Sequence, residues 1–100
     1  MKSDLFNKYA AAISDISGIR TSDIFSKNKA RAVADARNLL YYMCKKRMMT
    51  PAYIRKYMSD KGYDTGFFPI AYGIKSVEKK LDSDPDYNSI VELVDKKVHR

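Results

Sequence analysis

Apolar residues recur at intervals of three and four along most of the chain, the spacing that lines one face of a helix. The first such stripe consists of Leu5, Tyr9, Ala12, Ile13 and Ile16. It predicts a helix over residues 3–17, with Ser3 as its N-cap and Gly18 as its C-cap. The sequence lacks the period-two alternation that is typical of a half-buried strand. The pattern therefore favours an all-α fold.

Capping residues and further stripes of the same period predict the remaining helices. Thr50 and Asp84 are expected N-caps, because each precedes a proline, which is favoured at the first helical position. The helices expected after the first span residues 21–25, 29–48, 51–59, 67–81 and 85–98. The helix over 29–48 is apolar nearly all round in its second half, so it should be central. We expect one domain over residues 1–100, a small orthogonal bundle of five to six helices.

Composition limits the class of protein. Hydrophobic residues make up 45% of the chain and charged residues 31%, a balance typical of a folded domain. No apolar run approaches a membrane span of about 20 residues, and the N-terminus lacks an apolar signal core. A cytoplasmic, nucleoid-associated protein is therefore expected, with no membrane partner.

Few side chains offer reactive chemistry. Cys44 is the single cysteine, so it cannot form an internal disulfide, and we expect a small buried hydrophobe in a reducing compartment. His99 is the single histidine and, being penultimate, is expected to be frayed. The sequence shows no pattern typical of a serine nucleophile, of paired catalytic carboxylates or of a glycine-rich phosphate loop. The sequence thus predicts neither an enzyme nor a cofactor or metal site.

The formal net charge of +7 is concentrated in the middle of the chain. Between Arg20 and Lys61 there are eleven basic and three acidic residues, a net +8, so the remaining segments sum to −1. Such an excess favours a polyanionic partner, either nucleic acid or an acidic membrane surface.

Two predicted helices joined by a glycine-containing turn, over residues 50–81, indicate a helix-turn-helix. The major groove is about 12 Å wide and admits one helix, whose early residues reach base edges. The expected outer face of helix 67–81 carries aromatic rings and positive charge but no acid: Phe68, Tyr72, Lys75, Ser76 and Lys79. The alternative is an ordinary helical hairpin on the surface of a bundle.

A second basic feature precedes the long helix. Lys27 and Lys29 lie in an expected loop, followed by Arg31 and, two turns later, by Arg37. Basic residues beside a helix N-terminus can bind phosphate or enter a minor groove. The alternative is that these charges simply face solvent, as runs of basic residues commonly do. Lys45 and its two basic neighbours complement the negative end of a helix dipole, and they are also placed for phosphate contact.

Residues from about Tyr9 to Val94 resemble the C-terminal DNA-binding domain of the bacterial replication initiator DnaA. Ile19–Lys27 is similar to the family's hydrophobic-x-x-x-Asp-Leu-Leu-Ser-Lys pattern, and Ala30–Asn38 to its Arg-x-Val-x-x-x-Arg-Gln. Weaker similarity continues through Thr50–Ile54 and Lys75–Glu78.

The resemblance implies roles for particular residues. Lys27, Lys29 and Arg31 fall where the family uses a basic loop to enter the minor groove. The positions near its phosphate contacts are those of Arg37, Lys45 and Thr50.

The segment before the expected reading helix departs from the family. Segment 60–69 is longer than the family's Gly-Gly-Arg-Asp-His-Thr-Thr and lacks the base-reading Asp-His-Thr group. The fold and the docking on DNA are expected to carry over, but the initiator's target sequence is not. The initiator's ATPase module has no counterpart in these 100 residues, which suits a protein of a phage or mobile element, or a small regulator.

We therefore expect a protein that binds double-stranded DNA, with replication proteins as further partners. Helix 67–81 would enter the major groove through Phe68, Pro69 and Tyr72, with Lys75 and Lys79 on phosphates. The alternative is a protein-interaction module whose basic and aromatic surface binds an acidic protein. The oligomeric state and the target sequence are left open.

Overall fold

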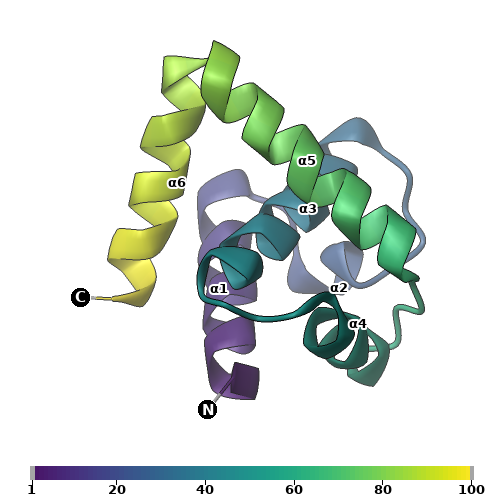
Figure 1. Cartoon of the computed structure of the whole chain (residues 1–100). Helices are drawn as coiled ribbons and strands as arrows, with labels where there is room; N and C mark the ends of the chain where they lie inside the picture. The colour runs from purple at the N-terminus through teal and green to yellow at the C-terminus, as the bar shows by residue number, and fades with distance from the viewer. Residues whose placement is uncertain (1, 100) are drawn as a thin grey trace.

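Six helices make up the part of the chain that the computed structural model describes, residues 2–99 (Figure 1). They are α1 (Lys2–Ser17), α2 (Thr21–Ile24), α3 (Arg31–Lys46), α4 (Pro51–Asp60), α5 (Phe67–Ser83) and α6 (Pro85–Val98). The all-α class and the small helical bundle are confirmed, and each expected helix is present with ends within two residues of those predicted. One cap is wrong, because α1 begins at Lys2 and Ser3 lies in its first turn.

The caps predicted at Thr50, Asp84 and Gly18 form as expected. The Thr50 hydroxyl accepts a hydrogen bond from the Tyr53 amide at 3.4 Å, and an Asp84 carboxylate oxygen accepts one from the Asp86 amide at 3.0 Å. Each bond satisfies an amide that has no partner within its helix. Gly18 ends α1 with a φ of +75°, a left-handed conformation that glycine adopts without a steric penalty.

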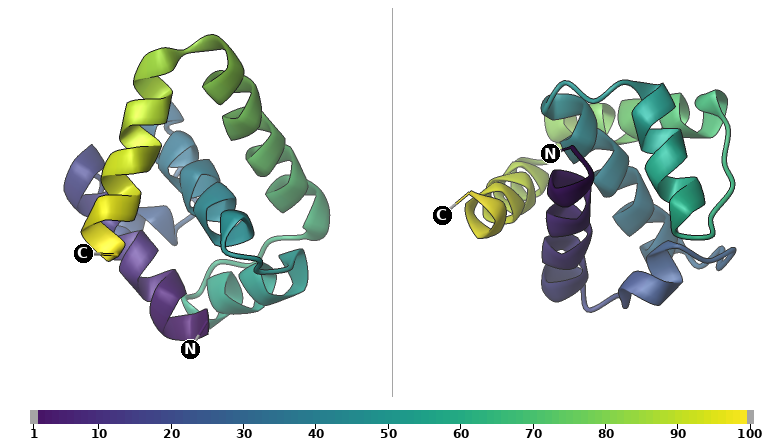
Figure 2. Two further views of the ribbon diagram at one scale, coloured as in Figure 1. Left: turned by 60° about the vertical axis from the view of Figure 1, so that its left-hand side comes forward. Right: turned by 90° about the horizontal axis from the view of Figure 1, so that it is seen from below.

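As its apolar pattern predicts, α3 lies at the centre of the bundle. Figures 1 and 2 show it between α1 and α5, with α6 returning along α1. The largest fully buried side chains come from every helix: Phe6, Tyr9, Ile13, Ile24, Leu40, Tyr41, Met43, Ile54, Met58, Ile70, Val77 and Val94. Their removal from water is the main force that holds the helices together.

The crossing of α3 and α5 depends on Gly73. A Cβ atom at this position would lie 2.5 Å from Oδ1 of Asn38 and 3.0 Å from the Tyr41 ring. The same tyrosine bonds through its hydroxyl to Thr65, just before α5, and its pKa is raised chiefly by burial. The glycine therefore sets how closely α5 approaches the central helix.

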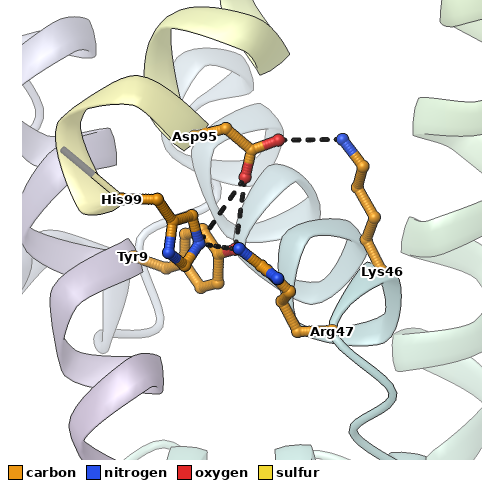
Figure 3. A network of polar contacts seen from close by, with 5 residues as sticks. All are labelled: Tyr9, Lys46, Arg47, Asp95 and His99. Carbon is orange, nitrogen blue, oxygen red and sulfur yellow. Dashed lines mark hydrogen bonds and ion pairs between the residues drawn. The ribbon is translucent and has the colours of Figure 1, made fainter.

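A polar network ties the end of α6 to α1 and to the end of α3 (Figure 3). The buried Tyr9 hydroxyl donates to Asp95 at 3.2 Å, accepts from Nε of Arg47 at 3.0 Å, and lies 3.0 Å from Nε2 of His99. Lys46 donates to the second oxygen of Asp95 at 2.8 Å. Burial is the main cause of the raised pKa of Tyr9. The expectation that His99 is frayed is wrong, because the phenol holds its ring.

The single cysteine, Cys44, is fully buried in the core, as expected. Burial raises the pKa of its thiol to about 12, so the side chain is un-ionised near neutral pH. Over residues 2–99, no helix has the length and apolar character needed to cross a membrane.

Candidate nucleic-acid interface

The outward face of α5 carries the aromatic and basic side chains that its sequence predicts. The face of α5 turned to the core is made by Ile70, Gly73, Ile74 and Val77. At 100° per residue, Phe68, Tyr72, Lys75 and Lys79 point almost directly away from it. Phe68 is 89% exposed and Tyr72 76% exposed. Large apolar rings in that position mark an interaction site more often than a solvated surface.

The lysines of this outward stripe are available to a partner. Within residues 2–99, the side chains of Lys75 and Lys79 are exposed and have no hydrogen bond or ion pair, and the same holds for the side chains of Lys27 and Lys29 in the loop before α3. Pro69 is also exposed, at the third position of α5. These five sequence-predicted residues are therefore accessible.

Two ion pairs link α3 to the two flanks of α5. On one flank, the Asp35 carboxylate lies 3.0 Å from Nζ of Lys80 and 3.7 Å from Nε of Arg31. On the other flank, Lys45 lies 3.3 Å from Glu78. Asp35 and Glu78 are thus each paired with a cation, whereas Asp82, in the last turn of α5, is exposed and has no ion pair among residues 2–99. Of the predicted contacts on α3, Arg31 and Lys45 thus lie beside α5.

Arg37 departs from its expected role. The side chain is not placed to contact phosphate, because the residue is 7% exposed and its guanidinium points inward. Nε donates to the Ile24 carbonyl at 2.9 Å, and one terminal nitrogen donates to the carbonyls of Ser26 at 2.8 Å and Asn28 at 3.4 Å. The guanidinium also lies 4.4 Å from the centre of the Tyr63 ring. Arg37 therefore fixes the loop before α3 beside the turn before α5.

The signal for this inward position was present in the sequence. Arg37 follows Val33 by four residues and precedes Leu40 by three, so it lies on the buried stripe of its helix. A charged residue on such a stripe needs buried partners. Pattern alone could not name them, since they are backbone carbonyls of residues 24–28.

The turn between α4 and α5 is closed by backbone hydrogen bonds. Gly62 has a φ of +91°, and the amides of Gly62 and Tyr63 donate to the carbonyls of Ser59 and Met58. This pair of bonds is a Schellman motif, which ends α4 sharply. The hydroxyl of Ser59 also donates to the Asp64 carboxylate at 3.1 Å. The lengthened segment is thus an ordered turn that positions the first residue of α5.

Two further exposed residues were not singled out from the sequence. Arg55 of α4 lies 5.3 Å from the centre of the Phe67 ring, which extends the aromatic and basic surface from α5 onto α4. Met48 is the second such residue: it is exposed and has a φ of +66° in the connection before α4. Thr50, two residues later, serves as the N-cap of α4. Thr50 therefore has a structural task whether or not it meets phosphate.

Comparison with known proteins gives one informative result. Neither a protein family model nor a solved structure matches the chain significantly. Over 80 residues, or 79% of its length, the chain is 29% identical to the chromosomal replication initiator protein DnaA of Lachnoclostridium phytofermentans. The chain is distantly similar to DnaA. The matched stretch spans only 17% of that protein, so the activity of the whole initiator does not transfer with it. The similarity to DnaA agrees with the resemblance seen in the motifs.

Proposed function

We propose that this protein binds double-stranded DNA, with α4 and α5 acting as a helix-turn-helix and the first turns of α5 entering the major groove. The proposed activity is binding and not catalysis. The observation that carries the proposal is the outward stripe of α5, where two exposed rings are followed by two lysines without ion pairs, and where Asp35 and Glu78 on the flanks are already paired with cations. That arrangement presents apolar and cationic groups together to a polyanionic groove.

The loop before α3 supplies the second set of phosphate contacts in this proposal. Lys27 and Lys29 have no partner within the described chain, and Arg37 holds their loop beside the turn that leads into α5. A loop fixed in this way can reach the backbone or the minor groove next to the helix without a large ordering cost.

The similarity to DnaA supports a place for this binding in replication initiation or its regulation, with replication proteins as further partners. We propose that the protein belongs to a phage or another mobile element. The target differs from that of the initiator in this proposal, because the turn before α5 has another length and lacks the base-reading Asp-His-Thr group.

The test is the salt dependence of binding to a random duplex, measured by fluorescence anisotropy. If about six phosphates are neutralised, log K falls with log salt at a slope near −5. The double variant Lys27→Ala, Lys29→Ala should weaken binding and reduce that slope by about two. The double variant Lys8→Ala, Lys96→Ala removes the same charge from exposed positions on α1 and α6, and should leave the slope nearly unchanged. Equal effects of the two pairs would refute the assignment of the loop.

The exposure of Phe68 also favours a second candidate, a module that binds an acidic protein. A gel shift with random duplex separates the two functions. Salt-sensitive retardation supports DNA binding. Its absence, together with a protein partner that is recovered by the wild type but not by Phe68→Ala, supports the second candidate.

A further inference from the structure

The first two turns of α5 offer a partner almost no polar group that could read a base. The helix sequence FFPIAYGIKSVEKKLDS contains no arginine, asparagine or glutamine. Arginine reads guanine through two parallel hydrogen bonds, and asparagine or glutamine reads adenine in the same way. Lysine can also contact guanine, but the first lysine of α5 is Lys75, two turns beyond the helix start. Recognition by the early residues of this helix therefore cannot rest on paired hydrogen bonds.

Apart from the Tyr72 hydroxyl, the exposed side-chain groups of these two turns are apolar. Phe68 is 89% exposed and Tyr72 76% exposed, one turn apart on the same outward stripe, and Pro69 and Ala71 are exposed beside them. The one apolar group that a base pair presents in the major groove is the C5-methyl group of thymine. Phenylalanine and alanine are among the side chains that contact it.

We propose that the protein selects its site by packing Phe68 and its apolar neighbours against thymine methyl groups in the major groove. The inference rests on the proposed DNA binding and adds the chemical feature that is read. The lysines further along the stripe and on the loop before α3 hold the backbone, so they set affinity but carry no sequence information.

Stacking of unpaired bases on the two rings is the rival use of the same surface. Duplex DNA fits better, because the rings stand on the ridge of a helix whose flanks are joined to α3 through Asp35 and Glu78. Proteins that stack single strands line a groove that follows the strand, whereas a protruding helix fits the width of the major groove.

The experiment starts from a site that the wild-type protein selects from a random duplex library. Thymines of that site are then replaced one at a time by deoxyuracil, which removes only the methyl group. A methyl group that packs against Phe68 should weaken binding by about fourfold when it is removed. Phe68→Ala should bind the thymine duplex more weakly than the wild type does. On the uracil duplex, the variant and the wild type should bind with equal affinity. Phe68→Leu keeps an apolar side chain and should retain most of the preference for thymine.

A double-mutant cycle combines the Phe68→Ala substitution with the thymine-to-uracil replacement, and it separates a lost contact from an altered DNA shape. If removal of the methyl group acts through DNA shape, it weakens binding of the wild type and of Phe68→Ala equally. If it removes a contact with Phe68, it weakens binding of the wild type alone. Because Phe68 is almost fully exposed, an unchanged thermal unfolding midpoint for Phe68→Ala will show that the variant is folded.

Four results would overturn the inference. A selected site without thymine, or equal affinity for thymine and uracil duplexes, refutes methyl reading but leaves salt-sensitive duplex binding standing. Tighter binding to single strands than to duplex refutes the inference in favour of base stacking. Failure to bind any duplex in a salt-sensitive way refutes the proposed function itself.

Discussion

The buried guanidinium of Arg37 should contribute more to stability than any surface cation of this protein. It satisfies three backbone carbonyls that hold the loop before α3. A hydrogen bond to a charged group contributes about 1.5–3 kcal/mol, and two of the three are 2.9 Å or shorter. Arg37→Leu keeps the apolar bulk and the helix propensity but leaves those carbonyls unpaired. We expect it to lower the free energy of unfolding by about 3–5 kcal/mol.

A loss of this size is a large share of the roughly 5–15 kcal/mol that stabilises a small domain. It should lower the melting temperature by about 12–40 °C, at about 4–8 °C per kcal/mol for this chain length. Urea unfolding followed by far-ultraviolet circular dichroism measures the free energy directly.

The same substitution at Arg31 is the matched control. That side chain lies on the same helix, is 87% exposed and has one ion pair, at 3.7 Å. Arg31→Leu should change the free energy of unfolding by no more than about 0.5 kcal/mol. If the two variants lose the same stability, or if Arg37→Leu loses less than about 1 kcal/mol, the role assigned to the buried guanidinium is refuted.

Two further predictions concern the core. Gly73→Ala should lower the free energy of unfolding, measured by urea denaturation, by about 1–3 kcal/mol. Alanine has the better helix propensity, but its Cβ would collide with Asn38. Unchanged stability would show that α5 can move away from α3 at no cost. The raised pKa of Cys44 makes the folded thiol keep its proton while the unfolded thiol loses it, so stability should fall as pH rises from about 9 towards 12, and less steeply in Cys44→Ala. Equal pH profiles for wild type and variant would contradict the second prediction.

Local chemistry explains why the helices could be predicted so closely. Thr50 and Asp84 act as caps through bonds to amides two or three residues away, so their effect is contained in a few letters of sequence. Gly18 likewise ends its helix through its own backbone conformation. The prediction for Ser3 was wrong because capping decides a helix start only to within a residue or so.

The candidate site was only partly readable in this way. The outward stripe of α5 follows from helical periodicity, so Phe68 and Tyr72 were placed correctly. The carbonyl partners of Arg37 and the pairing of Lys45 with Glu78 depend on how segments from different elements pack. No pattern in one helix contains that information, and the resemblance to DnaA placed Arg37 among phosphate contacts instead.

The network around Tyr9 has a consequence for the proton positions on His99. A phenol oxygen carries one proton and two lone pairs. The Tyr9 hydroxyl donates its hydrogen bond to Asp95. Both lone pairs of its oxygen therefore accept, one from Arg47 and the other from the imidazole of His99. Nε2 must therefore bear hydrogen, which selects one neutral tautomer. In that tautomer Nε2 donates and Nδ1 is left as an acceptor, so the imidazole has one orientation in which it can hold the end of α6 against α1.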